Sequence, residues 1–550
     1  MQYISLFFVG NWKIICNFAA EIKHDGIMGR FLDRGNDEFV STRNDEYVDK
    51  TAMIQYINDT LNKPIRFSCV SRCRRFGKSM VANMLYAYYD RSCDSRHLFE
   101  DMAIAKMPSY EQHLNKYPTL FVDMTSFTTD FRGNKDVVNI MQQTIKQEIC
   151  ELYPDVKVRE SDNLMDVLLR VVECTGDRFI MIIDEWDAIC RESENMNGVM
   201  EKYVDWLRRM FKGDSTARVF LGVYMTGILP IKKYNTQSAL NNFREYSMVK
   251  PGKLASSLGF THDEVKALCE KHDMDLGEME RWYDGYKIGR QTRMFNPYSV
   301  MNAIFDEDYR SYWQSTSAYE NISSYIQMNF EGLKDDMIRM LAGESVDVNT
   351  TRFQNDMKIV RSKDDVLTVL IHLGYLSYDE DTKTCRIPNK EVADELENAV
   401  MDTSWSELIK TIENSKKLLE ATVNCDEKAV ASAIDTAHDE QTSILTYNNE
   451  NSLACVLAVA YIWAKNEYVI HREYASGKGF ADLVMIPRKN VNKPALVIEL
   501  KYNTAVDTAI DQILSKNYPE KIKEYADNLL LVGISYDRET KQHICKIERA

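Results

Sequence analysis

Gly77, Lys78 and Ser79 stand between an apolar run that predicts a strand, 65–71, and a segment that predicts a helix, 78–89. At such a junction, backbone N–H groups can cradle anionic oxygens while the lysine reaches terminal phosphates and the next hydroxyl holds magnesium. The residue types therefore indicate nucleotide chemistry. The pattern is incomplete, because Arg72 replaces the first glycine of GxxxxGK[ST], so it needs support from elsewhere in the chain.

Two neighbouring acids provide that support. Asp184 and Glu185 follow five apolar residues, 179–183. This order is typical of a buried strand that delivers carboxylates to its C-terminal edge, where ligands bind in open parallel sheets. Asp184 would order magnesium through water, and Glu185 would polarise the attacking water. The alternative is a strand capped by solvated acids.

Other side chains around this pair could contact a nucleotide. Thr226 ends the next buried strand and is placed to sense the terminal phosphate, unless it is an ordinary strand-end hydroxyl. Arg74, Arg75 and Arg244 are candidates for charge stabilisation, and no spacing rule selects one of them. The predicted nucleotide contacts are Arg74, Arg75, Phe76, Gly77, Lys78, Ser79, Asp184 and Thr226, with Ser79 and Asp184 also binding magnesium.

A second group of residues suited to phosphate chemistry lies near the C-terminus. Strand alternation places Glu499 and Lys501 on one face of an apolar run, and a predicted hairpin brings Asp482 beside Glu499. Metal-dependent phosphodiester cleavage requires carboxylates that converge on divalent ions, with a cation near the attacking water. Glu450 could complete the metal shell, and Glu473 competes with it. The alternative is a coincidental Glu–Lys pair on a binding module.

The pattern of the chain predicts how the first group is positioned. Near-continuous apolar runs at 65–71, 119–124, 179–183 and 218–225 suit strands buried on both faces of a parallel sheet. Helical stretches separate these runs, which predicts a doubly wound sheet with helices on both sides. We expect this α/β P-loop domain to span 28–258.

Further regions flank this domain. Residues 259–435 are mainly helical, and a short alternation near 374–378 and 384–387 predicts a small hairpin, winged-helix-like in outline. Residues 436–550 form a last domain in which helices and strands mix. Residues 1–27 differ from the rest and are either a tail or an over-extended start ahead of Met28.

Composition narrows the class of protein. The chain of 550 residues is too long for one core, and its apolar runs fall far short of the roughly 20 residues that span a membrane. The net charge of −15 leaves any nucleic-acid contact to local basic patches or transient encounters, although an acidic cytosolic protein fits equally. The 12 cysteines form no CxxC pair or Cys/His cluster, which predicts reduced core thiols in a cytoplasmic protein.

Several segments resemble one known family. The loop 74–79 and the acidic segment 184–187 are similar to those of the AAA-ATPase-like family, which in bacterial proteins often accompanies a C-terminal PD-(D/E)XK nuclease domain. Cys73 stands where a proline is usual and Trp186 where a tyrosine is usual, and neither change removes a phosphate or metal ligand. The resemblance implies ATP, whereas the residues alone do not separate ATP from GTP. Further matching segments are 47–51, 240–244, 282–286, 295–300 and 387–392.

The C-terminal region resembles the PD-(D/E)XK nuclease family in its order of elements: helix, strand, strand with Asp482, strand with Glu499 and Lys501, helix. This resemblance implies a restriction-endonuclease-like α/β domain. Phe480 occupies a place where that family often has arginine, which weakens a substrate contact or local packing but leaves the metal triad intact.

Together the two sites predict an ATP-binding and hydrolysing protein with a magnesium-dependent nuclease domain, in which manganese could replace magnesium. The predicted partner is nucleic acid, with DNA favoured over RNA, and no membrane partner is expected. The alternative is a nucleotide-gated switch that binds a partner and cuts nothing. The sequence leaves open a homo-oligomer, the strand preference, and whether ATP triggers or restrains cutting.

Overall fold

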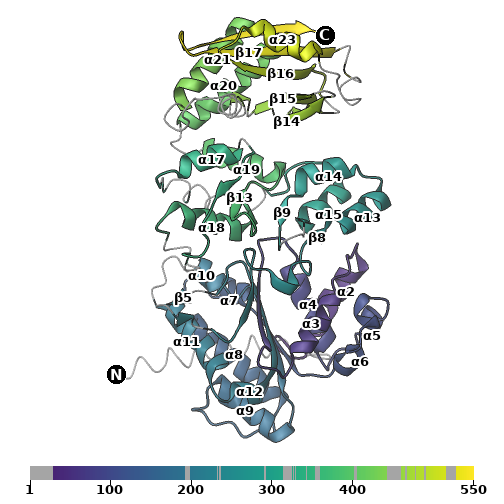
Figure 1. Ribbon diagram of the computed structural model, residues 1–550. Coiled ribbons are helices and arrows are strands. Elements are labelled where there is room, and N and C mark those ends of the chain that lie inside the picture. The colour runs from purple at the N-terminus through teal and green to yellow at the C-terminus, as the bar shows by residue number, and fades with distance from the viewer. Residues whose placement is uncertain are drawn as a thin grey trace. The chain divides into compact units, whose positions relative to one another are not determined.

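The chain divides into two compact units, which are Met1–Trp313 with Asp347–Val392, and Gln314–Val346 with Ala393–Ala550. The structure is a computed structural model, and the predicted tail at 1–27 lies outside the residues that it describes (Figure 1). It describes residues 29–550 except 193–197, 232, 235–236, 239, 290–292, 314–324, 326–327, 329, 342, 354–359, 402–405, 442–456, 458–459, 462, 465–466, 477–478, 489–490, 516–524 and 526–527.

A parallel sheet forms the centre of the first unit. Its strand order is β2-β3-β4-β1-β7, and every neighbouring pair runs parallel. This arrangement confirms the predicted parallel sheet, because the four apolar runs of the sequence become four of its five strands. The strands are β1 (Phe67–Ser71), β2 (Thr119–Asp123), β3 (Phe179–Asp184), β4 (Phe220–Gly227) and β7 (Arg244–Tyr246).

Helices cover both faces of this sheet (Figure 1). The side chains of β3 alternate between two hydrophobic cores, one on each face of the sheet. Met181 and Ile183 belong to one core, and Ile180 and Ile182 belong to the other. The first core is completed by α8 (Val137–Leu152), α9 (Leu164–Thr175) and α11 (Val199–Lys212), and the second by α3 (Ala52–Thr60) and α4 (Lys78–Tyr89). Shorter helices of the unit are α2 (Asp37–Asn44), α5 (Arg96–Phe99), α6 (Tyr110–His113), α7 (Met124–Asp130), α10 (Ala188–Glu192) and α12 (Thr216–Val219).

The rest of the first unit is mainly helical, as the sequence predicts. The hairpin predicted there is confirmed, because β12 (Ser377–Asp379) and β13 (Thr384–Arg386) pair antiparallel. A small sheet of order β8-β10-β9 joins β8 (Phe260–Thr261), β10 (Arg293–Phe295) and β9 (Tyr286–Lys287). The helices are α13 (His262–His272), α14 (Leu276–Tyr283), α15 (Pro297–Asp306), α18 (Lys363–Leu373) and the start of α19 (Lys390–Met401).

The second unit contains a mixed sheet of order β14-β15-β16-β17-β18. Only β16 and β17 run parallel, and α23 (Val506–Ser515) connects them. α20 (Ser406–Val423) and α21 (Glu427–Gln441) cover one face of the sheet, and α23 packs against the other. The strands are β14 (Tyr468–Ser476), β15 (Gly479–Pro487), β16 (Ala495–Tyr502), β17 (Leu529–Asp537) and β18 (Gln542–Arg549), and α17 (Leu333–Leu341) also belongs to this unit.

None of the helices described here is both long and apolar enough to cross a bilayer.

Candidate nucleotide and nuclease sites

The loop between β1 and α4 leads directly into the N-terminus of α4. Gly77 adopts a left-handed conformation, with φ of 80°, directly before Lys78 begins the helix. Glycine suits this position because L side chains rarely adopt positive φ. The Lys78 side chain is almost fully buried, and its Nζ lies 3.2 Å from the carbonyl oxygen of Cys73 and 3.2 Å from Oε1 of Glu185. The ammonium therefore sits between the loop and the acidic end of β3.

Arg72 explains why the first glycine of the usual pattern is missing. Its side chain is fully buried and donates hydrogen bonds to three carbonyl oxygens, those of Ser71 (2.9 Å), Tyr246 (3.0 Å) and Leu254 (2.9 Å). Burial lowers the pKa of this guanidinium to about 10. Arg72 thus ties the loop to β7 and to the turn that follows it.

Two acids, Asp184 at the end of β3 and Glu185 directly after it, lie beside this loop. Asp184 is buried, and burial raises the pKa of its carboxyl to about 6, opposed by a hydrogen bond with Ser79. Glu185 has a left-handed backbone, with φ of 50°. Burial acts to raise the pKa of Glu185, but the positive charges of Lys78 and Arg191 outweigh it, and the net shift is downward. Oxygen donors from Ser79 and Asp184 match the ligands that magnesium prefers.

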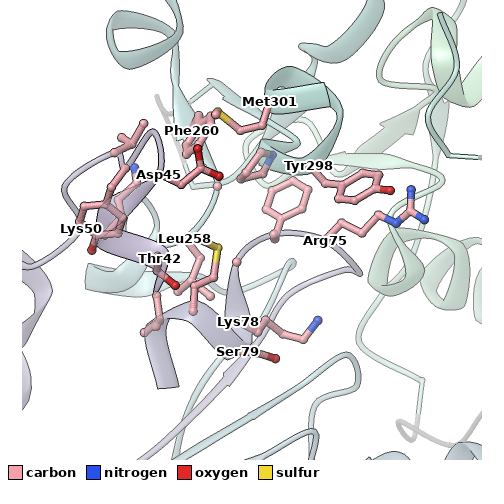
Figure 2. Close-up of a pocket in the computed structure, with 18 of the residues that line it drawn as sticks. Thr42, Asp45, Lys50, Arg75, Lys78, Ser79, Leu258, Phe260, Tyr298 and Met301 are labelled. Atoms are coloured by element: carbon pink, nitrogen blue, oxygen red, sulfur yellow. The ribbon is translucent and has the colours of Figure 1, made fainter. Parts of the chain in front are cut away.

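Thr226 and the neighbouring arginines occupy different surroundings. Thr226 is the second-last residue of β4 and lies beside Val70. Its buried Oγ1 has no hydrogen-bond partner among the described residues. Arg75 lies with its guanidinium 3.9 Å from the ring centre of Tyr298 and donates to the carbonyl oxygen of Tyr312 at 2.5 Å. Figure 2 shows this guanidinium directed toward Tyr298 and away from Lys78. The assignments of Thr226 and Arg75 to a nucleotide stay predictions.

The other two arginines differ in burial. Arg74 is partly buried, and burial together with the nearby charge of Arg191 lowers its pKa. Glu185 and Asp187 act in the opposite direction, so Arg74 belongs to the electrostatic surroundings of the site. Arg244 is exposed on the edge strand β7.

A pocket of about 570 Å³ opens from the phosphate loop. Figure 2 shows Lys78 and Ser79 at one end and Phe260 and Met301 at the other. Val48 and Leu258 add apolar surface to the lining. Besides the phosphate loop, the start of α4 and Glu185, the lining comes from α2, the segment 45–50, the segment 257–260 and α15, so the pocket combines parts of the chain that are far apart in sequence.

Ion pairs fasten one wall of this pocket to α13. Nζ of Lys50 lies 2.6 Å from Oε2 of Glu264, and Oε2 of Glu46 lies 2.6 Å from Nζ of Lys271. Glu264 is also the residue that completes the capping box of α13 with Thr261. The wall at 45–50 is therefore fixed to the start and end of the same helix.

The second predicted site lies on β16. Leu496, Ile498 and Leu500 join one core, while Val497 joins the core on the other face, so the predicted alternation of this strand is confirmed. Glu499 is buried, and its Oε1 lies 3.3 Å from Nζ of Lys501. The Glu499–Lys501 pair is thus a real contact within an otherwise apolar strand.

The pairing of β15 with β16 bears on Asp482. Leu483 faces Ile498 and Val484 faces Val497, so the same register places position 482 opposite Glu499. The side chain of Asp482 and the whole of Glu450 lie outside the described residues. Within the part of the chain that is described, no group of three or more His, Cys, Asp or Glu side chains could hold a metal ion. The complete metal triad stays a prediction.

Two family models match the chain. Residues 35–236 match a family described as predicted AAA-ATPase, and residues 448–546 match the PD-(D/E)XK nuclease superfamily. The chain carries an AAA-ATPase-like domain and a C-terminal PD-(D/E)XK nuclease domain. The first contains the phosphate loop with Asp184 and Glu185, and the second contains Asp482, Glu499 and Lys501.

One curated relative and two solved structures show more distant similarity. An uncharacterized protein in the vnfD 5′ region of Azotobacter chroococcum mcd 1 is 23% identical over 276 residues, which cover 49% of this chain and 50% of that protein. The chain thus spans about half the length of this relative.

Both solved structures are from Aeropyrum pernix. The ORC2 protein in its ADPNP–ADP complexes is 13% identical with a TM-score of 0.29, covering 68% of this chain and 98% of its own. The ORC1 protein in complex with DNA is 11% identical with a TM-score of 0.26, covering 69% and 99%. Similarity at this level supports no conclusion about the ligands of this chain.

Sequence reasoning missed two residues of the AAA-ATPase-like domain that the structure places at its site. Asp187 is fully buried and accepts hydrogen bonds from the backbone N–H groups of Ile228 and Leu229. Arg191 pairs with Glu185 at 2.5 Å and with Asp187 at 3.4 Å. A signal was present in the chain, because Asp187 and Arg191 are four residues apart, the spacing of neighbours on one helix face.

Proposed function

We propose that this protein binds and hydrolyses ATP in its AAA-ATPase-like domain and cuts nucleic acid, with DNA as the favoured substrate, in its PD-(D/E)XK nuclease domain. The observation that carries the first activity is the convergence of Lys78, Ser79, Asp184 and Glu185 at one edge of the parallel sheet, where a pocket of about 570 Å³ opens.

The pocket suits a nucleotide along its length. The loop around Gly77 would receive the phosphates, because helix N-termini attract anions. The apolar side chains at the far end, among them Phe260 and Met301, suit a nucleobase. Ser79 and Asp184 would hold magnesium, which neutralises charge that develops on the phosphates. Glu185 would orient and polarise the attacking water, while Lys78 would move from Glu185 to the phosphate oxygens.

The second activity is supported by the buried Glu499, its contact with Lys501 and the register that places position 482 opposite Glu499. A buried carboxylate beside a lysine on an apolar strand is unusual unless both serve a polar site. Asp482 and Glu499, with Glu450 as the further predicted ligand, would bind magnesium or manganese. Lys501 would then act on the attacking water or the scissile phosphate.

The test uses the full-length protein with mixed DNA and RNA substrates, with and without ATP, in Mg²⁺ or Mn²⁺. Lys78→Ala should abolish ATP hydrolysis, and Lys501→Ala should abolish cutting. Two lysines serve as controls that retain both activities: Lys63→Ala, an exposed lysine of the same unit as Lys78, and Lys546→Ala, on strand β18 of the same sheet as Lys501. Unchanged cutting by Lys501→Ala would overturn the nuclease assignment.

Calorimetry with Mn²⁺ separates this proposal from a nucleotide-gated switch that binds a partner and cuts nothing. Cutting requires a metal site that is lost when Asp482 and Glu499 are replaced by Asn and Gln. Absence of such a site, together with intact ATP binding, would favour the switch.

A further inference from the structure

Arg191 connects two acids of the turn that follows β3. Its Nη2 lies 2.5 Å from Oε2 of Glu185, and its Nε lies 3.4 Å from Oδ2 of Asp187. The arginine side chain is mostly buried and Asp187 is completely so. One guanidinium therefore spans from a fixed, buried carboxylate to the carboxylate that faces the phosphate loop.

The two oxygens of Glu185 have different partners. Oε1 lies 3.2 Å from Nζ of Lys78, and Oε2 is held by Arg191. The proposed function requires phosphate oxygens to draw Lys78 away from Glu185. Oε1 of Glu185 then loses its partner at the moment when the carboxylate must orient the attacking water. Arg191 comes from α10 rather than from the phosphate loop, so nucleotide binding does not compete for it in the same way.

Asp187 provides a buried anchor for the side chain of Arg191. The backbone N–H groups of Ile228 and Leu229 donate to its carboxylate, the latter at 2.9 Å. The carboxylate also lies close against the backbone of Gly227, since a Cβ at Gly227 would stand 2.5 Å from Oδ1 of Asp187. The ion pair with this buried, hydrogen-bonded carboxylate positions the guanidinium, and the guanidinium in turn positions Glu185.

The turn itself is held by contacts that do not involve Arg191. The backbone N–H of Trp186 donates to the carbonyl oxygen of Thr226 at 2.8 Å, and Nε1 of Trp186 donates to that of Leu229 at 3.2 Å. The N–H of Ala188 donates to the carbonyl oxygen of Glu185 at 2.8 Å. Loss of Arg191 should therefore leave the backbone of the turn in place and free only the Glu185 side chain.

We propose that Arg191 is a positioning residue for ATP hydrolysis: anchored on Asp187, it holds the carboxylate of Glu185 toward the attacking water after Lys78 has turned to the phosphates. This inference rests on the proposed function, since it assigns the orienting partner of the same carboxylate. It predicts that Arg191 serves the chemical step rather than ATP affinity.

The kinetic test measures kcat, KM and the Kd of ATP for the full-length protein and its Arg191→Lys, Arg191→Met and Arg191→Ala variants. Arg191→Met should lower kcat by about 10²-fold, the scale expected for a misplaced catalytic group, with Kd changed less than about twofold. Arg191→Lys should restore part of kcat, and added guanidinium should restore part of it in Arg191→Ala. Arg208→Met, an exposed arginine paired with Asp205 on α11, is the control with unchanged kcat. An unchanged kcat in Arg191→Met, or a loss of ATP affinity that matches the loss of kcat, would overturn the proposal.

A second measurement does not depend on ATP hydrolysis. In a Lys78→Met background, Arg191→Met and Glu185→Gln are combined in a double-mutant cycle read by the shift in Tm. Non-additive shifts show that Arg191 holds Glu185 without Lys78, and additive shifts overturn the positioning role. If the wild-type protein hydrolyses no ATP, the proposed function fails, and this cycle still decides whether Arg191 holds Glu185.

Discussion

Gly374 lies directly against Cys73 of the phosphate loop: a Cβ at Gly374 would stand 2.6 Å from the Cβ of Cys73 and 2.9 Å from its Sγ. The carbonyl oxygen of the same glycine accepts a hydrogen bond from the hydroxyl of Tyr286 at 2.8 Å. The Tyr286 ring packs edge-on against Phe76, with ring centres 5.2 Å apart. The outer side of the phosphate loop is therefore shaped by residues that follow it by about two to three hundred positions.

Replacement of Gly374 by alanine should disturb the nucleotide site from this outer side. Gly374 has φ of 92°, so alanine adds backbone strain of about 1 kcal/mol as well as a clash with Cys73 worth about 1–3 kcal/mol. We expect lower stability to unfolding and weaker ATP binding. Gly133→Ala is the matched control, because Gly133 has φ of 79° but open space around it. Equal effects of the two substitutions in thermal unfolding would contradict the packing argument.

Arg72→Gly should damage the protein although it restores the first glycine of the common nucleotide-loop pattern. The substitution removes a buried side chain and its hydrogen bonds to three carbonyl oxygens, those of Ser71, Tyr246 and Leu254. The last of these keeps only a long bond of 3.4 Å from the Ser257 N–H. Each buried acceptor left unpaired costs about 1–3 kcal/mol, so a loss of about 3 kcal/mol or more is expected. Denaturant unfolding measures this loss, and ATP binding should weaken with it. A stable variant with tighter ATP binding would show that the Arg72 hydrogen bonds are not needed to hold the loop to β7 and the following turn.

These residues show where sequence reasoning succeeds and where it ends. The central strands could be predicted because strands buried on both faces leave continuous apolar runs, and Asp184 and Glu185 could be placed because β3 is one of them. The face of β16 that carries Glu499 followed from simple alternation.

The other features depend on contacts that no local pattern encodes. In the sequence, Arg72 only interrupts a known motif. Its structural role depends on hydrogen-bond partners on β7 and in the following turn, which lie more than 170 positions away in the chain. The pocket is likewise built from α2, the segment 257–260 and α15, so its walls could not be assembled from spacing. A role for Arg191 can be inferred only from the structure, in which its guanidinium pairs with both Glu185 and Asp187.

Glu391 should make stability depend on pH. It is fully buried, and burial raises the pKa of its carboxyl to about 7, although Ser299 Oγ donates to it at 2.8 Å and Tyr312 N–H at 2.7 Å. Because the folded pKa is raised, this group favours folding below the ordinary carboxyl pKa, and the contribution is lost as pH rises through 7.

Glu391→Gln tests that sign. The amide keeps the shape and an acceptor oxygen but never ionises, so it should stabilise the protein at pH 8 by on the order of 2 kcal/mol and change little at pH 5. Chemical unfolding at both pH values measures the difference. Glu160→Gln, at an exposed carboxylate of the same unit, should have little effect at either pH. Lower stability of the Glu391→Gln variant than of the wild type at pH 8 would mean that the ionised carboxylate is favourable here.

Glu499 and Lys501 should differ in how their loss affects metal binding and cutting. Glu499→Gln removes a predicted metal ligand and should abolish both Mn²⁺ binding and cleavage. Lys501→Met removes only the cation that lies 3.3 Å from Oε1 of Glu499, so it should abolish cleavage and leave Mn²⁺ binding intact or tighter. Calorimetry and a cleavage assay on the same preparations separate the two roles.

The same pair makes a prediction about stability. In the metal-free protein, Lys501→Met takes the nearby cation away from a buried carboxylate, which is costly in a nonpolar setting, whereas the Glu499→Gln, Lys501→Met double variant removes the charge as well. The double variant should therefore be more stable than Lys501→Met alone, and added Mn²⁺ should rescue only the single variant. Lys546→Met, whose lysine pairs with Asp507 and Glu548, is the matched control on the neighbouring part of the sheet. Equal stability of the single and double variants would show that Glu499 has other compensation for its charge.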